Sequence, residues 1–208
     1  MTDSIWTWGL AEFRDRTASA DPTPGGGSAA MASAAIGMGL VLMALRVTEG
    51  KVDDKAPLAP LIEGGDRLLA EVSGHADTDI AVFEAYMAAL KLPRDTDEEK
   101  AARRAALAEA AVAATEVPLN AAQSVLECLD LARQAAAVAD QGILSDVAAG
   151  AALLNGAVTA VLYNVDINLK SVKDADMAAD FAKSRKHLAS AAETRHGSII
   201  ALVEDRLA

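Results

Sequence analysis

The chain has 208 residues, of which 52% are hydrophobic and only 3% aromatic, and its formal net charge is −11. Strands favour β-branched and aromatic residues whereas alanine and leucine favour helices, so this alanine-rich composition predicts an all-α fold. The acidity argues against nucleic acid or an anionic membrane as a partner, because both bind through clustered lysine and arginine. A small anionic ligand remains compatible with a local basic cluster such as Arg103–Arg104.

The single cysteine, Cys128, excludes an intrachain disulfide and suits a reducing compartment. It falls on the apolar side of an expected helix, which favours a buried structural thiol over a nucleophile. The first fifteen residues contain no basic segment of the kind that opens a signal peptide. We therefore expect a cytoplasmic protein.

The first half of the chain is expected to form three helices, at 4–16, 27–49 and 57–91. The clearest break is the segment 17–28, TASADPTPGGGS, because prolines and glycines interrupt helices. Gly50 is a natural C-terminal cap for the second helix.

The second half is expected to be helical as well, with one interruption. Thr96 and Glu99 form a capping box, which marks a helix start. Pro118 predicts a kink or a break in that helix, and Ser145 is a candidate N-cap for the next one. The expected helices are 96–116, 119–140, 145–169 and 176–206.

Two runs without charge, Ser28–Leu45 and Val147–Val165, are long enough to cross a membrane. Both are rich in small residues, and neither has aromatic belts or strongly basic flanks. We interpret them as two helices buried on most sides within a soluble bundle. Residues 1–208 are thus expected to form one domain of about six or seven helices, with no membrane span.

The glycine run in PTPGGGS is not a P-loop, because no Lys-Ser/Thr pair follows it and no strand precedes it. A purely structural turn is one interpretation. Three consecutive glycines are nevertheless costly to order, so they favour a place where the backbone passes close to a ligand or partner. The N–H groups at the start of the following helix would then face that ligand.

His75 and Asp79 are spaced to meet one helical turn apart, as a base and its orienting carboxylate or as a solvated pair. Phe83 and Tyr86 continue the same stripe, which indicates that this face is at least partly covered.

Asn164 and Asn168 lie one turn apart on an otherwise apolar helix. Buried amides need partners, so these two indicate either a hydrogen-bonded helix contact or a polar ligand. The chain lacks His-x-x-x-His, Glu-x-x-His and Cys-x-x-Cys spacings, and no tight metal site is expected.

The segment Pro22–Ser28 followed by an alanine-rich helix resembles the signature of the formiminotransferase-cyclodeaminase C-terminal family. The resemblance covers essentially the whole chain, with departures at Val52 and at Asp140–Ile143. Five further segments match the family in order: Thr48–Lys51, Asp79–Phe83 closed by Leu92-Pro93, Val117–Leu119, Ser145-Asp146 and Asn164–Leu169.

This resemblance implies an all-α, usually dimeric subunit that binds tetrahydrofolate and acts on a one-carbon unit at N5 or N10. We expect a methenyltetrahydrofolate cyclohydrolase, which adds water to the 5,10-methenyl derivative to give 10-formyltetrahydrofolate. One alternative is a cyclodeaminase that releases ammonia from the formimino derivative. Another is a helical folate-binding or scaffold protein without turnover. No cofactor is expected beyond the tetrahydrofolate substrate.

For this chemistry we expect a carboxylate beside the cationic methenyl bridge, with other groups assisting proton transfer. The expected catalytic residues are Asp79, His75 and Lys51. The expected substrate-binding residues are Pro24, Gly25, Gly26, Gly27, Ser28, Phe83, Tyr86, Asp146, Asn164 and Asn168.

Overall fold

A computed structural model describes residues 3–208, and within that range the regular structure is helical, with no strand. It contains six α-helices, which confirms the predicted all-α, single-domain class. The elements are η1 (Ile5–Thr7), α1 (Leu10–Thr17), α2 (Gly26–Glu49), α3 (Ala59–Leu90), α4 (Asp97–Val138), η2 (Gln141–Ile143), α5 (Leu144–Asn168), η3 (Leu169–Ser171) and α6 (Ala175–Leu207).

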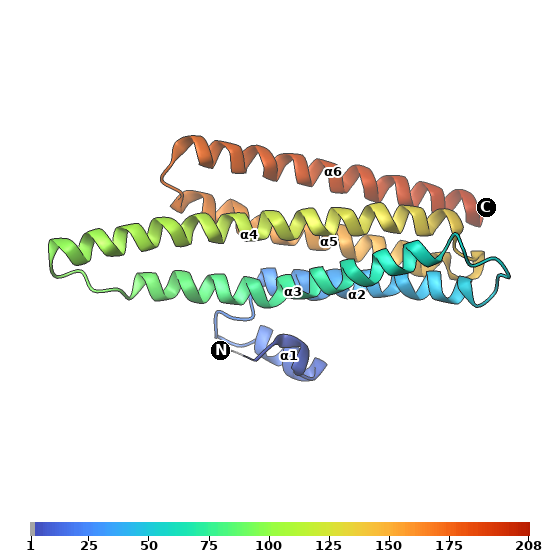
Figure 1. The fold of residues 1–208 in the computed structure, drawn as a ribbon, viewed down its shortest axis with the longest axis horizontal. Coiled ribbons are helices and arrows are strands. Elements are labelled where there is room, and N and C mark those ends of the chain that lie inside the picture. Colours follow the sequence, from blue (N-terminus) through green and yellow to red (C-terminus); the bar gives the residue numbers. More distant parts are fainter. Residues whose placement is uncertain (1–2) are drawn as a thin grey trace.

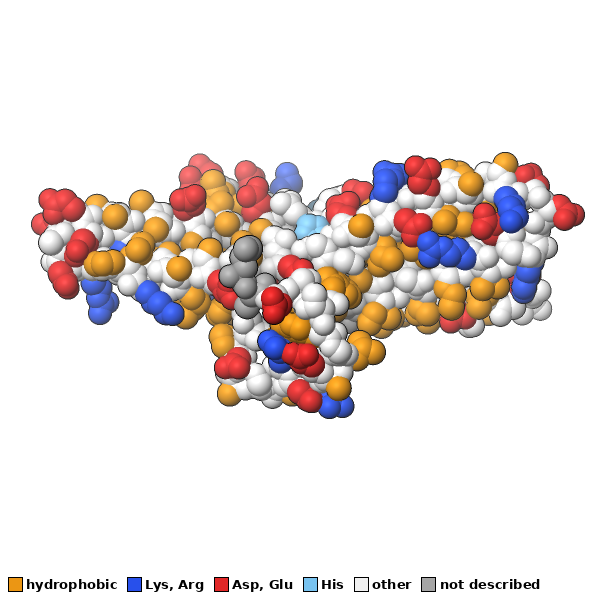
Figure 2. Space-filling model, turned by 60° about the horizontal axis from the view of Figure 1, so that its bottom comes forward, with side chains coloured by type: hydrophobic (Ala, Val, Ile, Leu, Met, Phe, Trp, Pro, Cys, Tyr) orange, Lys and Arg blue, Asp and Glu red, His pale blue; other side chains and the backbone are white. Residues whose placement is uncertain are grey.

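The five long helices form an elongated bundle (Figure 1). Helices α2, α3, α4 and α5 each run antiparallel to the next, and α6 returns alongside α4 in the same direction. The hairpin of α3 and α4 extends beyond the other helices as a two-helix arm. The short segment of η1 and α1 projects from the side of the bundle (Figures 1 and 2).

Helices α2 and α5, which contain the two uncharged runs, pack against each other at very short range. A Cβ atom built on Gly37 would lie 2.8 Å from the carbonyl oxygen of Gly150, and one built on Gly150 would lie 2.6 Å from that of Gly37. Only glycine at both positions lets the two backbones meet here. The crossing fixes how the ends of α2 and α5 line up.

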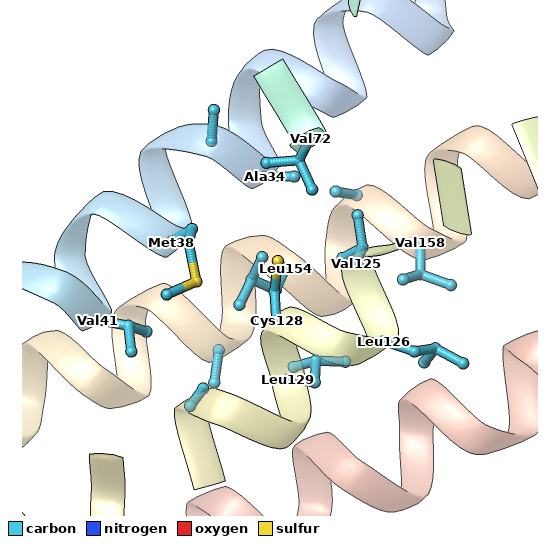
Figure 3. Packing of buried hydrophobic residues seen from close by; sticks show 14 of the residues in the cluster. Ala34, Met38, Val41, Val72, Val125, Leu126, Cys128, Leu129, Leu154 and Val158 are labelled. Carbon is cyan, nitrogen blue, oxygen red and sulfur yellow. The ribbon is translucent and has the colours of Figure 1, made fainter. Parts of the chain in front are cut away.

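Cys128 lies in the core with Met38 and Leu154, where α2, α4 and α5 meet (Figure 3). Its side chain is fully buried, and this burial raises the pKa of the thiol to about 12. The thiol is therefore protonated and enclosed at neutral pH. The predicted structural role for this cysteine is confirmed.

Of the kink or break predicted at Pro118, the break is absent, because α4 runs unbroken from Asp97 to Val138. A proline lacks the N–H that would bond the carbonyl four residues earlier, here that of Ala114. The side-chain amide of Asn168 donates to that carbonyl at 2.6 Å instead. A neighbouring helix thus satisfies the group that the proline leaves open.

Two expected helix starts are also corrected. Ser4 caps the short helix η1, accepting from the Trp6 N–H, and α1 begins separately after Gly9, so residues 4–16 are not one helix. Helix α5 begins at Leu144, directly after η2, which leaves Ser145 inside the helix and not at its cap. The capping box of α4, by contrast, is confirmed.

Two stretches, Gly26–Glu49 and Gln141–Ser171, are long and apolar enough to cross a membrane by length and composition alone. Core helices of soluble proteins pass the same test. Here both stretches supply buried residues to the shared core. The outer face of α5 is distinctive, because its exposed residues from Ala149 to Ile167 carry no charge.

Candidate active site

A cavity of about 320 Å³ opens where the first turn of α2 meets α3, α4 and the last turns of α5. The antiparallel packing brings these segments together from distant parts of the chain. Polar, aromatic and backbone groups all reach it: Gly25, Gly26, Asp79, Phe83, Tyr86, Asn164 and Asn168 lie in its walls.

Among residues 3–208, Asp79 is the only carboxylate in the cavity wall, and it is held by groups from two other helices. Its Oδ2 accepts the backbone N–H and the hydroxyl of Ser28, both at 3.0 Å. Its Oδ1 accepts the side-chain amide of Asn164 at 3.3 Å. Asp79 therefore caps the N-terminus of α2 from α3, where the helix dipole favours a negative charge.

Burial raises the pKa of Asp79 above its ordinary value, while the hydrogen bonds from Ser28 and Asn164 act in the opposite direction. Partial desolvation disfavours the ionised carboxylate and so raises the pKa. It is the larger of the two opposing effects on the pKa of Asp79. The outcome is a carboxylate that is oriented by fixed donors and is a stronger base than an exposed aspartate. Such a group is suited to take a proton at neutral pH.

Ser28 is fully buried and touches Asp79 without lining the cavity. Its hydroxyl oxygen lies 3.0 Å from both Asp79 Oδ2 and the carbonyl oxygen of Ala76. One hydroxyl proton serves one acceptor at a time. When Asp79 is ionised, Ser28 can donate to it. When Asp79 is protonated, Ser28 can accept from it and donate to Ala76, so both states of the carboxyl have a partner.

Gly27 lies directly against the polar side chains of the site. A Cβ atom built on it would collide with Asp79 Oδ1 and with Asn164 Nδ2. The sequence predicted that the glycines allow a close approach to a ligand or partner. At Gly27 the structure shows close approach to Asp79 and Asn164 of the same chain.

Gly25 and Gly26 begin α2, and both contact the cavity directly. Gly25 is the N-cap and provides no side-chain cap. The first N–H groups of a helix have no partner within that helix. The helix start therefore presents backbone donors to the cavity, beside the Thr23–Pro24 peptide, which is cis.

Asn164 and Asn168 each use the amide NH₂ within the protein. Carbonyl and carboxylate oxygens only accept, so the NH₂ group of Asn168 must face Ala114 and that of Asn164 must face Asp79. Among residues 3–208 the hydrogen bonds of both asparagines use the NH₂ groups and none uses the amide oxygens, and both residues line the cavity. Of the two interpretations that the sequence left open, the helix contact is shown for Asn168, and two acceptors remain for a ligand.

Phe83 and Tyr86 form the aromatic part of the cavity wall, one helical turn and two turns beyond Asp79. Val82 and Met87 lie on the same side and are joined by Ile167 from α5. A flat ring placed between these side chains would have its polar edge toward Asp79 and the two asparagines.

His75 does not pair with Asp79, although it lies one helical turn away. Its Nε2 is 3.0 Å from the hydroxyl of Ser124, which also donates to Glu71 at 2.5 Å. Burial lowers the pKa of His75, with Glu71 opposing this change. His75 belongs to a polar cluster between α3 and α4 that lies outside the cavity wall, so the predicted base–carboxylate pair is wrong for this chain.

Lys51 and Asp146 lie at the far end of the bundle from the cavity. The whole of α2 separates Lys51 from Gly26, about 35 Å at 1.5 Å per residue. Lys51 Nζ instead pairs with Asp140 Oδ1 at 2.7 Å, and this hydrogen bond lowers the pKa of Asp140. Within this chain neither Lys51 nor Asp146 reaches Asp79.

Several wall residues were not among the expected site residues, namely Pro22, Thr23, Val82, Met87, Ala114, Pro118 and Ile167. Conversely, Pro24 is buried and does not line the cavity. Asp79 and Phe83 are spaced i, i+4 on α3. Val82 lies three residues after Asp79 and Met87 lies four residues after Phe83, so the same helical spacing could also have identified these two residues. Across residues 3–208, no group of histidine, cysteine, aspartate and glutamate side chains could hold a metal ion.

The fold and the site together define a class: an all-α bundle with an oriented carboxylate at a glycine-rich helix start, inside a mixed polar and aromatic cavity. Residues 9–187 match the model of the family described as formiminotransferase-cyclodeaminase. The chain belongs to this family.

Three comparisons place the chain within it. A methenyltetrahydrofolate cyclohydrolase of Methylorubrum extorquens is 36% identical over 203 residues, covering 95% of this chain and 97% of the relative. The formimidoyltransferase-cyclodeaminase of Sus scrofa is 34% identical over 201 residues, but the match covers only 36% of that longer protein. A formiminotetrahydrofolate cyclodeaminase structure from Thermotoga maritima shares the fold, with a TM-score of 0.84 at 22% identity over 97% of this chain and 98% of that one.

Proposed function

We propose that this chain is a methenyltetrahydrofolate cyclohydrolase, which converts 5,10-methenyltetrahydrofolate and water to 10-formyltetrahydrofolate. The observation that carries the proposal is Asp79, a partly desolvated and firmly oriented carboxylate at the cavity wall. The near full-length similarity to the Methylorubrum extorquens cyclohydrolase supports it.

The methenyl carbon is part of a cationic amidine bridge between N5 and N10, so a nearby carboxylate stabilises the bound substrate by charge pairing. Asp79 takes one proton from a water as its oxygen bonds to the bridge carbon. The carbon–N5 bond then breaks, Asp79 returns that proton to N5, and the formyl group stays on N10. The second water proton leaves to solvent, which balances the loss of the positive charge.

The remaining cavity groups would bind the pterin ring. Its ring and amino N–H donors match the open amide oxygens of Asn164 and Asn168. Backbone N–H groups at the start of α2 would donate to its carbonyl oxygen. Phe83 and Tyr86 would pack against its flat faces. No further cofactor takes part in this scheme.

The test is loss of the methenyl chromophore, followed for the wild-type protein and for Asp79→Asn. The variant keeps the size of the side chain and an oxygen that can accept from Ser28, but it is not a base. We expect turnover to fall by about 10²–10⁴-fold with the fold retained. Asp53→Asn, the same substitution at an exposed aspartate outside the cavity wall, is the control and should leave turnover unchanged. Near-wild-type turnover by Asp79→Asn would refute the role of the carboxylate.

The main alternative is ammonia release from 5-formiminotetrahydrofolate, favoured by the similarity to the Sus scrofa bifunctional protein. It would use the same cavity. Ammonia release from the formimino compound, without loss of the methenyl chromophore, would replace the cyclohydrolase proposal. Folate binding with neither reaction would indicate a non-catalytic folate-binding protein.

We also infer a cytoplasmic homodimer that associates through the outer faces of α2 and α5. Ile36 on α2 and Tyr163 and Ile167 on α5 are exposed by 54%, 63% and 68% on these faces. Single soluble chains rarely expose an extended apolar surface, and a second copy of the same face would cover it under two-fold symmetry. Gly39 and Gly156 have open space beside them on these helices, which leaves room for close contact.

A two-fold arrangement in which the α2 helices run antiparallel would bring the Lys51 end of one subunit toward the cavity of the other. The expected roles of Lys51 and Asp146 depend on such a shared site. Sedimentation of wild type and of Ile36→Asp tests the dimer, with the variant expected to be monomeric. Mixing inactive Asp79→Asn with Lys51→Ala subunits tests sharing, because recovered activity requires one site built from two chains.

A further inference from the structure

The last turn of α5 carries a charged side chain directly behind the proposed active site. Asp166 lies between Asn164 and Asn168 in the sequence, and its carboxylate binds the guanidinium of Arg185 on α6. Arg185 Nε donates to Asp166 Oδ1 at 2.9 Å, and Nη2 donates to Oδ2 at 2.8 Å. Two parallel hydrogen bonds of this kind fix the orientation of both side chains.

Helical geometry places this ion pair on the side of α5 away from the cavity. Each residue turns a helix by about 100°, so side chains two positions apart point in nearly opposite directions. Asn164 and Asn168 are four residues apart and share the face that lines the cavity. Asp166 points the other way, toward α6. One side of this turn therefore binds α6 while the other side forms the cavity wall.

Asp166 lies where local rules disfavour a carboxylate. The C-terminus of a helix has a partial negative charge, which favours lysine or arginine there and opposes aspartate. The last turn of α5 contains no basic residue. Arg185 supplies the positive charge from the neighbouring helix instead. The sequence thus places an aspartate against its local preference at a position where α6 can hold it.

Asn168 depends on this turn because it is the last residue of α5. Helix ends open more readily than helix interiors, since their final carbonyls have no partner within the helix. The hydrogen bond from Asn168 to the Ala114 carbonyl holds the side chain. The contact between Arg185 and Asp166 holds the helix two residues earlier. The two contacts fasten the same turn from opposite sides.

We propose that Arg185 is a positioning residue for substrate binding, which acts through Asp166 to keep the amide oxygen of Asn168 aimed into the cavity. This role rests on the proposed folate site, in which that oxygen accepts from the pterin. Arg185 itself does not line the cavity. Without the ion pair the last turn of α5 opens more often in the free protein, so the substrate must reorder it and binds more weakly.

A purely structural role is the alternative, in which the ion pair only fastens α6 to the bundle. Arg195 provides the matched control, because it lies on the same helix and binds Asp130 of α4 at 2.8 Å. The two arginine side chains are similarly exposed, by 25% for Arg185 and 33% for Arg195. Neither Arg195 nor Asp130 lines the cavity, so loss of their contact should change stability and leave substrate binding as it is.

The experiment compares Arg185→Met and Arg195→Met with wild type, using loss of the methenyl chromophore. For Arg185→Met we expect KM to rise about fivefold, close to the contribution of one hydrogen bond, with kcat within about twofold of wild type. Arg185→Lys restores the charge without the second hydrogen bond, so its KM should be intermediate. Arg195→Met should keep the wild-type KM, whatever its melting temperature.

A double variant tests whether Arg185 acts through Asn168. In an Asn168→Ala background, Arg185→Met should raise KM much less than it does in the wild type, because the group that it positions is already gone. An equal rise in both backgrounds would refute the positioning role. So would an equal rise in KM for Arg185→Met and Arg195→Met.

Hydrogen exchange separates this role from the cyclohydrolase proposal, because it requires no turnover. Backbone amides of residues 165–168 should exchange faster in Arg185→Met than in wild type or Arg195→Met. If the protein does not hydrolyse the methenyl substrate, its affinity for 5-formyltetrahydrofolate, measured by calorimetry, takes the place of KM. The same order of variants would then mean that the cyclohydrolase proposal fails and the role of Arg185 stands. Unchanged exchange in this turn of Arg185→Met, or a wild type that binds no folate, would overturn that role.

Discussion

Asn168 and Ala114 are joined by a 2.6 Å hydrogen bond, in which the side-chain amide on α5 donates to a backbone carbonyl inside α4. Pro118 is the cause, because it cannot supply the N–H that this carbonyl would otherwise accept. The bond lies in the cavity wall. It also turns the amide oxygen of Asn168 away from Ala114, so one interaction completes α4 and orients a candidate ligand acceptor.

This relationship predicts energetic coupling between Asn168 and Pro118. Asn168→Ala should lower the free energy of unfolding by about 1–3 kcal/mol, because the Ala114 carbonyl loses its partner. In a Pro118→Ala background the helix supplies that partner itself, so the same substitution should cost less. Chemical denaturation of the two single variants and the double variant measures the coupling. Additive effects would show that Asn168 does not compensate for the proline.

Gly27 should not tolerate a side chain. In Gly27→Ala the new methyl group would displace Asp79 and Asn164, so we expect both turnover and stability to fall. Gly74→Ala on α3 is the matched control, because no atom outside its own helix lies within 4 Å of a Cβ there. That substitution should stabilise the exposed helix by about 0.5–1 kcal/mol. Wild-type activity in Gly27→Ala would contradict the close packing of the site.

The pH dependence of turnover should report Asp79. A base must be deprotonated to act, so the rate should fall as pH falls through the pKa of this carboxyl. Burial places that acid limb above the ordinary aspartate value. Ser28→Ala removes a donor that favours the ionised form, and should move the limb to higher pH.

The control for that shift is Ser33→Ala, which changes another serine on the same helix. It should leave the pH profile where it is in the wild type. A Ser28→Ala limb that stays in place, or that moves to lower pH, would contradict the hydrogen bonding assigned to Asp79.

Cys128 should resist thiol reagents in the native protein. Its pKa of about 12 and complete burial leave no accessible thiolate near pH 8. Labelling by iodoacetamide should therefore proceed only through unfolding and should become rapid in guanidinium chloride. Fast stoichiometric labelling without denaturant would show that the core around α4 opens readily.

Much of the fold could be predicted because the relevant signals are local. The uncharged runs, the Thr96–Glu99 capping box and the break at 17–28 each act within one or two helical turns. The errors arose where a distant group changed a local preference. Pro118 should interrupt a helix by local rules, yet Asn168 lies 50 residues away in sequence and satisfies the open carbonyl.

Only some of the site residues were predicted correctly, because distant groups decide which side chains meet in the cavity. Asp79, Phe83, Tyr86 and Asn164 were singled out correctly as residues that share a surface, since helical spacing places the first three on one stripe. His75 has similar spacing but faces α4, where Ser124 offers a partner. The periodicity of a helix gives the angle of a side chain about its axis, and not what occupies the space on that side.

By itself, the sequence determined that the chain is helical, where most helices lie, and that its motifs resemble one folate-related family. The helices follow from composition, periodicity and short-range capping, whereas the resemblance rests on the quoted motifs alone. Only the tertiary structure decided that Ser28 holds Asp79, that Asn168 completes α4, and that Lys51 is remote from Asp79 along the bundle. The reason is physical, because these relationships depend on how antiparallel helices align after packing, and the Gly37–Gly150 crossing helps to set that alignment.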